Sequence, residues 1–506
     1  MGVIKRQSIK QSLVTYLGIL IGTISTLFIY PLLEVEQYGD IQFVISIAAF
    51  FVPFLGLGLP SVAIHFFPYF KDQKEKRGRF LFILLFVTLL SLIVSLSLIY
   101  LFKNLVSKYF SQNAYLFLNY LPYILSISFC VSFITILQAY ISNFNRIVVP
   151  SVIYNLTLKV FQPLLVIAYL AGFMYFTNIL DGLVLLHIII VLLTIYYLYH
   201  LGYLEINTKK IQTEKNLKKK IIDYSLFSIL TNVGGSLALQ IDKILIGLMV
   251  GARSLAIFQI PTLITEAIDV IRKAISGVSA PIISDSLKSN DMESVNSIYK
   301  KSALLQFTIG MFLLIGAWVC ADDLFHIMPK GKVFAEGKII ILILGASRLI
   351  DMLTGTNTEI ISFSQYYRMN LYFLLLLAVV NISSNYVLIS HYGNVGAAYA
   401  TLISMFFFNA AKLIFIYKKM EIHPFSSNMV GAIGIALFTL FLALLLPTIH
   451  LNTADEKMLL FFDKLSSILT IVLKGMVITI FYFILLWKFK ISEDINLMID
   501  NVLRKI

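Results

Sequence analysis

Apolar runs of about 20 residues recur along the whole chain, and this recurrence constrains the fold more than any other feature. A helix of about 20 residues crosses the roughly 30 Å hydrocarbon core of a bilayer and satisfies its own backbone hydrogen bonds there. We therefore expect an all-α polytopic membrane protein of about fourteen transmembrane helices. The windows place them at 12–33, 41–67, 80–102, 116–141, 147–170, 176–200, 221–250, 255–283, 300–320, 338–360, 369–390, 395–417, 428–449 and 467–489.

Composition agrees with this expectation. The 506 residues are 59% hydrophobic and 13% charged, against about 25% charged in ordinary soluble domains. The net charge of +13 comes from basic residues in short loops, which is typical of membrane topology rather than of nucleic-acid binding. Cys130 and Cys320 lack metal-ligand spacing. We expect membrane lipids around the chain and no nucleic acid, metal or cofactor.

The Lys and Arg residues indicate the orientation. Of 40 in total, we count 25 in loops on the side of the two termini and 8 in loops on the other side. Basic residues are retained on the cytoplasmic side, so both termini are predicted to be cytoplasmic. The basic N-terminus leads into an apolar run longer than the core of a signal peptide, and we expect it to remain as the first span.

One polar linker divides the chain. It contains NTKKIQTEKNLKKK, and we expect it to separate an N-terminal lobe of six helices, 1–205, from a C-terminal lobe of six helices, 221–420. The linker itself occupies 206–220, and 421–506 holds two further helices and a cytoplasmic tail. Weak similarity between corresponding segments of the two halves is typical of the internal repeats of transporters.

Several strings, taken in their order and spacing, resemble one known family. They are YGDIQ, GLGLPSVAIHFFP, YSLFSILTNVGGSLALQIDKILIGLMVG, PIISDSLKSNDMESVNSIYKKS and GNVGAAYATLIS. They are similar to the polysaccharide exporters, the lipid-linked oligosaccharide (O-antigen-type) flippases of the multidrug/oligosaccharidyl-lipid/polysaccharide (MOP) superfamily. The resemblance covers nearly the whole chain.

The resemblance implies a fold and a function. The fold would be two six-helix lobes related by pseudo-two-fold symmetry around a central cavity, as in the multidrug extruders, with two extra helices. The protein would lie in the bacterial inner membrane and move undecaprenyl-pyrophosphate-linked oligosaccharide units to the outer leaflet. These units would serve the synthesis of lipopolysaccharide O-antigen, capsule or exopolysaccharide, with a polymerase and chain-length proteins as candidate partners.

Charged residues inside the predicted spans are the candidate functional residues, because each costs roughly 2.5 to 3.5 kcal/mol at mid-bilayer without a partner or a water-filled cavity. In the span 255–283, Glu266, Asp269 and Lys273 fall within an arc of about 60°, whereas Arg272 points off it. An internal pair of Asp269 with Lys273 would explain the stripe as well as a cavity would.

Two other spans carry polar stripes. In 338–360, Arg348, Asp351 and Glu359 share one face, although an interfacial position explains Glu359 better. In 147–170, Ser151, Asn155, Lys159 and Gln162 fall within an arc of roughly 80°, with the cation too deep to reach the headgroups. We interpret Ser151, Asn155 and Gln162 as a polar cavity face.

The remaining embedded charges have simpler interpretations. Asp242, beside Lys243, is expected to be a structural partner between helices, and Lys412 and Lys474 are expected to extend toward the headgroups from positions near helix ends. His65 and His187 are titratable, but polar packing explains them better.

These residues combine into one hypothesis of transport. Lys159, Lys273 and Arg348 would form a cationic floor for the pyrophosphate headgroup, because Lys and Arg can replace the water around a phosphate. Glu266, Asp269, Asp351 and Asp242 are candidates for charge partners or for coupling to a proton or sodium ion. No catalytic residue is expected.

Three alternatives stay open. An ion-coupled multidrug extruder of the same fold would use acidic residues in the N-terminal lobe, and we find none inside the apolar cores of the first four predicted spans. A lipid II flippase would carry basic residues inside the first two spans, and the apolar cores of these two predicted spans contain none. A membrane glycan polymerase or glycosyltransferase would need a large outer loop or an acidic cluster, and the longest outer loops, 321–337 and 450–466, are short.

Overall fold

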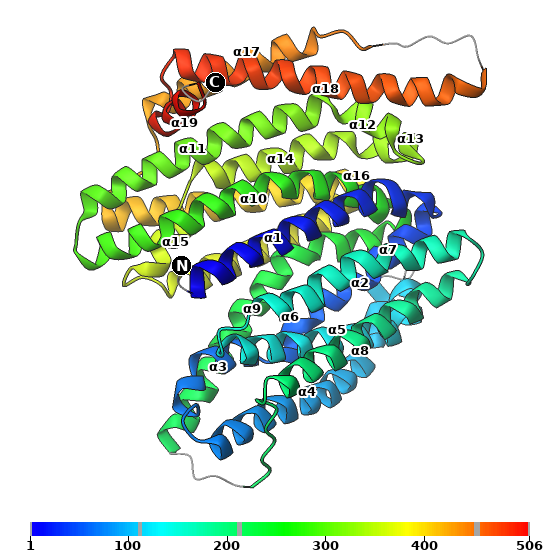
Figure 1. The fold of residues 1–506 in the computed structure, drawn as a ribbon, viewed down its shortest axis with the longest axis vertical. Coiled ribbons are helices and arrows are strands. Elements are labelled where there is room, and N and C mark those ends of the chain that lie inside the picture. Colours follow the sequence, from blue (N-terminus) through cyan, green and yellow to red (C-terminus); the bar gives the residue numbers. More distant parts are fainter. Residues whose placement is uncertain (1–2, 110–113, 210–214, 450–455, 504–506) are drawn as a thin grey trace. The chain divides into compact units, whose positions relative to one another are not determined.

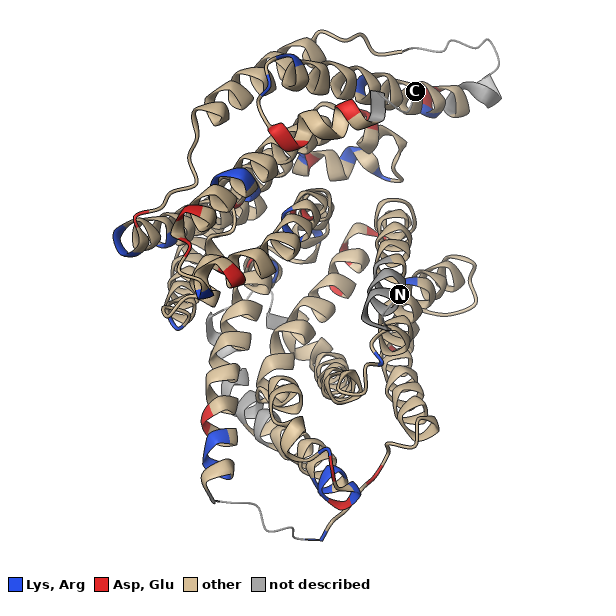
Figure 2. Cartoon of the chain, turned by 60° about the vertical axis from the view of Figure 1, so that its left-hand side comes forward, with Lys and Arg blue, Asp and Glu red and all other residues tan. Residues whose placement is uncertain are grey.

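The computed structural model describes residues 3–109, 114–209, 215–449 and 456–503, and this part of the chain is helical with short connections and no β-strand. It forms two compact units, Met1–Ala256 and Ile257–Ile506. Figure 1 shows the helices of each unit, and Figure 2 shows that Lys, Arg, Asp and Glu gather toward helix ends and loops while long stretches of helix between them carry no charge. The boundary between the two units falls after Ala256, whereas the predicted boundary between the two lobes is the linker 206–220. The division into lobes therefore stays a prediction.

Unit 1 is built around α2, which packs against α4, α5 and α9. Close packing depends on glycine: a Cβ on Gly39 would lie 1.9 Å from the carbonyl oxygen of Ala252, and one on Gly247 would lie 2.3 Å from the Phe43 ring. The helices are α1 (Val3–Ile24), α2 (Val35–Gly56), α3 (Leu59–His65), α4 (Lys74–Tyr109), α5 (Ala114–Ser142), α6 (Val148–Ser151), α7 (Thr157–Leu170), α8 (Phe176–His200) and α9 (Lys215–Met249).

Two π-helical turns interrupt this unit. Ser25–Ile29 continues α1 into the 3₁₀ turn Tyr30–Leu32, and Val152–Leu156 joins α6 to α7. The second π turn packs against α1, and the first packs against α7. Such turns occur as single insertions in helices, often at functional sites.

The residue before the predicted linker and the first residues of the linker are held against α4. Arg77 donates to Glu205 from Nη2 at 2.8 Å and from Nε at 3.0 Å, and Arg79 donates to the Thr208 carbonyl at 2.7 Å. The hydrogen bond to Glu205 raises the pKa of the Arg77 guanidinium, so this residue stays charged. The segment up to Thr208 is therefore fixed to unit 1 rather than free.

Unit 2 contains the rest of the chain from Ile257. In it, α11 packs against α14, α17 and α18, and α17 and α18 lie side by side (Figure 1). The helices are α10 (Ala252–Lys288, which begins in unit 1), α11 (Met292–Val319), α12 (Ala321–Ile327), α13 (Gly331–Phe334), α14 (Lys338–Leu353), α15 (Asn357–Phe363), α16 (Met369–Met420), α17 (Ser427–Leu444), α18 (Glu456–Lys488) and α19 (Glu493–Leu503).

Eleven helices in the described part are long and apolar enough to cross a membrane, which confirms a multi-pass membrane protein. The 52-residue α16 contains two of the predicted spans, because Gly393 has a non-helical backbone (φ 58°, ψ −136°) between them. The predicted spans 80–102 and 338–360 coincide with α4 and with α14 followed by α15. The all-α expectation is thus confirmed, and the count of fourteen stays a prediction.

Candidate functional site

Seven charged side chains gather inside unit 2, from four helices. We call them the charge cluster: Asp269, Arg272 and Lys273 from α10, Arg348 and Asp351 from α14, Glu359 from α15, and Lys412 from α16. With every group ionised, four cations face three carboxylates, so the cluster carries one net positive charge.

Arg272 is the centre of the cluster. Its Nε lies 2.7 Å from Asp269 Oδ1 and 3.1 Å from Asp351 Oδ2, so it joins α10 to α14. The sequence analysis placed Arg272 off the charged stripe. That prediction was wrong for the position of the guanidinium group, because an arginine side chain is long enough to reach a neighbour three residues back. The expected pair of Asp269 with Lys273 is also present, at 2.8 Å, with the Lys273 side chain 69% exposed against 22% for Arg272.

Arg348 and Asp351 share a face of α14, as expected, but Glu359 lies on a separate helix. The helix breaks at Thr354–Thr356, where Gly355 has a left-handed backbone (φ 58°) and a Cβ would lie 2.8 Å from that of Ala303. In the described part of the chain, Arg348 Nε and Glu359 Oε2 are buried and have no hydrogen-bond partner. Two opposite charges in the cluster are therefore incompletely satisfied.

Lys412 belongs to this cluster, and the sequence missed it. Its side chain was expected to extend toward the headgroups, but it is 2% exposed, and its ammonium donates to Thr358 Oγ1 at 2.8 Å and lies 3.7 Å from the centre of the Phe408 ring. Asn409, three residues earlier on α16, was the available signal, because a second polar residue at that spacing shares the face.

A polar network holds Thr358 in place. Its hydroxyl donates to Asn357 Oδ1 at 3.1 Å, and Asn357 Nδ2 donates in turn to Asn409 Oδ1 and Thr354 Oγ1, each at 3.0 Å. Because the Thr358 hydrogen is used by Asn357, its oxygen is left to accept from Lys412. The network therefore orients the ammonium of Lys412.

The predicted polar stripe of unit 1 is only partly maintained. Asn155 donates to Ser151 Oγ at 3.0 Å, but the π turn Val152–Leu156 lies within the stripe and changes the rotation per residue on which the predicted arc depended. Lys159 is exposed and lies over α1, with Nζ 3.0 Å from where a Cβ of Gly22 would be. Gln162 is half-buried.

The other candidates differ in their exposure. Glu266 is exposed on α10, and Asp242 on α9 is 8% exposed. His187 is buried and bonds the Leu183 carbonyl at 2.7 Å, in agreement with polar packing. Among the described residues, no group of His, Cys, Asp and Glu is arranged to hold a metal ion.

One acidic residue lies at the start of the second long helix. The second span was expected to start at residue 41, but α2 begins at Val35, so Asp40 lies inside an apolar helix. Tyr120 donates to Asp40 Oδ2 at 2.8 Å, and Oδ1 is buried without a hydrogen-bond partner in the described structure. Asp40 is the sixth residue of α2 and directly precedes the predicted apolar core, so the expectation that the cores of the first four spans lack acidic residues stays a prediction.

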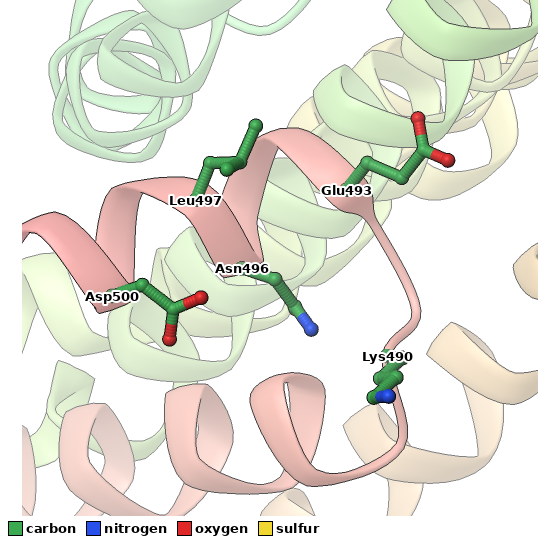
Figure 3. A pocket seen from close by; sticks show the side chains of 5 residues that line it. All are labelled: Lys490, Glu493, Asn496, Leu497 and Asp500. Carbon is green, nitrogen blue, oxygen red and sulfur yellow. The ribbon is translucent and has the colours of Figure 1, made fainter.

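A pocket of about 340 Å³ in unit 2 does not involve these residues. It lies beside α19 and is lined by Lys490, Glu493, Asn496, Leu497 and Asp500 (Figure 3). None of the residues predicted to act in transport lines it.

Comparison with known proteins identifies the family. Residues 4–287 match the family described as "Polysaccharide biosynthesis protein". The "Probable low-salt glycan biosynthesis flippase Agl15" of Haloferax volcanii is 20% identical over 233 residues, which are 46% of this chain and 49% of that protein. The chain thus spans about half the length of the curated relative it matches.

Two solved structures share the fold. "Lipid II flippase MurJ, inward closed conformation" has a TM-score of 0.62 at 13% identity and covers 93% of this chain and 98% of its own. A multidrug resistance MATE family transporter of the MOP superfamily, in an inward-facing conformation, has a TM-score of 0.65 at 12% identity. The match covers 80% of this chain and 94% of the transporter. These matches confirm an all-α fold like that of these two transporters, and the family match places the chain: it belongs to the polysaccharide biosynthesis protein family.

Proposed function

We propose that the chain is a flippase that moves undecaprenyl-pyrophosphate-linked oligosaccharide units from the cytoplasmic to the outer leaflet by alternating access, in a bacterial inner membrane with both termini cytoplasmic. The observation that carries the proposal is the net positive charge cluster on apolar helices of unit 2. A cation inside an apolar helix needs a function or a partner, and Arg348 Nε has no hydrogen-bond partner among the described residues.

Pyrophosphate suits this cluster chemically. It offers several oxygens to N–H donors, and arginine binds phosphate oxygens with its planar fork of donors. Arg348 and Lys273 are the unit 2 cations we assign to the headgroup, with Lys159 as the cation of unit 1. An inside-negative potential would assist the outward movement of an anion by about 2.3 kcal/mol per charge per 100 mV.

Coupling to an ion belongs to the same proposal. Glu266, Asp269, Asp351 and Asp242 are the carboxylates we assigned to it, for exchange of a proton or sodium ion. The lipid-linked oligosaccharide is the substrate, and the polymerase and chain-length proteins of O-antigen, capsule or exopolysaccharide synthesis are the partners we propose.

Depletion of the protein in its native host tests the proposal. Undecaprenyl-linked oligosaccharides are measured by mass spectrometry together with surface polysaccharide. Accumulation of complete units with loss of surface polysaccharide is expected, and a leaflet assay on the accumulated lipid separates a flippase from a polymerase. Plasmid-borne wild type restores the surface polysaccharide, and Arg348→Met is expected to restore less at equal protein level. Unchanged intermediates in the depleted cells would reject the proposal.

Asp40 favours a second candidate, an ion-coupled multidrug extruder. Its carboxylate lies within an apolar helix of unit 1 with one oxygen unpartnered among the described residues, which is the kind of group a cation or proton binds. A rise in dye or drug sensitivity on depletion, without change in the lipid-linked oligosaccharides, would support this alternative.

A further inference from the structure

Lys412 and Glu359 are opposite charges that attract each other without a direct contact. In the described part of the chain, no ion pair within 4.0 Å joins them, although both belong to the charge cluster. Glu359 Oε2 is buried and has no hydrogen-bond partner in the described part of the protein. The Lys412 ammonium has three N–H donors and gives one of them to Thr358 Oγ1.

The surroundings of Lys412 contain few other ways to balance its charge. From α14 the cluster contributes Arg348 and Asp351, from α15 Glu359, and from α10 Arg272, which opposes the charge of Lys412. Phe408, on the same helix, offers the face of its ring. Lys412 is 2% exposed, and a lysine that is so deeply buried among these groups can lose its proton and with it its charge. An arginine in the same place would keep its charge.

The carboxylates first assigned to coupling are less suited to this task. Asp269 is held by both Arg272 and Lys273, and Asp351 is held by Arg272. Protonation of either carboxylate would leave a buried guanidinium without its partner. Glu266 is exposed rather than part of the contacts. Lys412 can change its charge without breaking an ion pair, because its ammonium is bound by the Thr358 hydroxyl and not by a carboxylate.

We propose that Lys412 is the proton-linked group of the charge cluster and that its protonation decides whether the cluster binds an anionic headgroup. With the ammonium present, four cations face three carboxylates and the cluster is positive by one. When the ammonium loses its proton, three cations face three carboxylates and the cluster is neutral. A pyrophosphate is held in the first state and released in the second.

The proton balance of this step is simple. The Lys412 ammonium releases one proton to water and becomes a neutral amine, so the charge of the cluster falls by one. The helix that carries its hydrogen-bond partner Thr358 ends at Phe363, and Arg368 follows in the next connection, which is predicted to be cytoplasmic.

The experiment measures binding of farnesyl pyrophosphate, a polyprenyl pyrophosphate without sugar, to the full-length protein in nanodiscs of neutral phosphatidylcholine. Affinity is measured from about pH 6 to about pH 9.5, a range in which a lysine with an altered environment can lose its charge. The variants are Lys412→Arg and Lys412→Met, which have similar side-chain length, and each must elute as a single species before use.

The expected results separate the variants. Wild-type affinity falls by about tenfold as the pH rises, because one positive charge near the ligand is lost. Lys412→Arg binds tightly throughout and loses most of this fall, since arginine keeps its charge. Lys412→Met binds weakly at every pH. Titration of the ligand itself is common to all three proteins and cancels in the comparison.

Two outcomes count against the inference in different ways. It rests on the proposed function, so absence of farnesyl pyrophosphate binding by the wild type at every pH would reject the headgroup site together with it. Tight wild-type binding with the same pH profile in Lys412→Arg would overturn the role of Lys412 alone and leave the headgroup site standing.

Discussion

Arg272 Nε lies 2.7 Å from Asp269 Oδ1 on its own helix and 3.1 Å from Asp351 Oδ2 on α14. One guanidinium thus compensates two carboxylates that are largely removed from solvent. A buried charge that loses its partner is much more costly than a pair replaced as a whole. The stability of unit 2 should therefore depend on Arg272 more than on its sequence neighbour Lys273.

Arg272→Met is expected to destabilise the purified protein by about 2 to 4 kcal/mol, because both carboxylates lose a partner. Thermal unfolding in detergent should show a Tm lower by several degrees. Lys273→Met is the matched control, since Lys273 is mostly exposed and bonds only Asp269. Equal shifts in Tm for the two variants would contradict the central position of Arg272.

Gly22 should control the position of Lys159. A Cβ on Gly22 would lie 3.0 Å from both Cδ and Nζ of Lys159, so Gly22→Ala displaces the end of this flexible side chain without a backbone clash. We expect a Tm within about 1 °C of wild type and a surface polysaccharide level reduced by at least about twofold, since a displaced cation no longer meets the headgroup.

Gly18 provides the control for this change. It lies one turn earlier on α1, and a Cβ there would meet nothing within 4 Å. Gly18→Ala should leave surface polysaccharide unchanged in the same complementation assay. If both alanine variants reduce the polysaccharide equally, helix α1 itself rather than Lys159 responds to the change.

The sequence predicted well what depends on hydrophobic periodicity. The apolar windows found helices in every predicted span that the structure describes, because a helix in a bilayer must be continuous and apolar for about 20 residues. The break within the predicted span 338–360 was not predicted: Gly355 resembles the many glycines that pack helices closely, and only its backbone angle shows that it interrupts the helix.

Side-chain partners were harder to predict than helices. Rotation at 100° per residue described Asp269 and Lys273 correctly, because their contact lies within one helix. It could not describe Arg272, which reaches α14, or Lys412, whose partner Thr358 is 54 residues earlier in the chain. A π turn adds a residue to the helical turn and cannot be read from composition, so the arc drawn through Ser151 and Gln162 was unreliable.

Arg77 and Glu205 are expected to fix the start of the linker to α4. Both side chains are mostly buried, and Glu205→Gln removes the charge that Arg77 pairs with. The segment after Tyr203 should then open locally, because its contacts with α4 depend on this pair. Limited trypsin digestion of membrane vesicles with the cytoplasmic face outward should cut Glu205→Gln near Lys209 faster by about threefold or more.

Lys74→Gln is the control for that digestion. Lys74 lies 3.9 Å from Glu205 and its side chain is 78% exposed, so its pair with Glu205 is weak. The rate of cutting near Lys209 should stay at the wild-type value. Faster cutting in both variants would show that general loss of charge, not release of Glu205, exposes the linker.

Lys474 and Asp323 form the last pair with a testable consequence. The Lys474 ammonium donates to Asp323 Oδ2 at 2.7 Å, and both side chains are about nine-tenths buried, so the expected extension of Lys474 toward the headgroups was wrong. Lys474→Met leaves the Asp323 carboxylate buried without this partner and should destabilise the protein by about 3 kcal/mol. In the double variant Lys474→Met, Asp323→Asn no charge is left over, and Tm should return most of the way to the wild-type value. The double-mutant cycle therefore measures a coupling between α12 and α18. Losses of Tm that simply add would mean that the two side chains stabilise their helices independently.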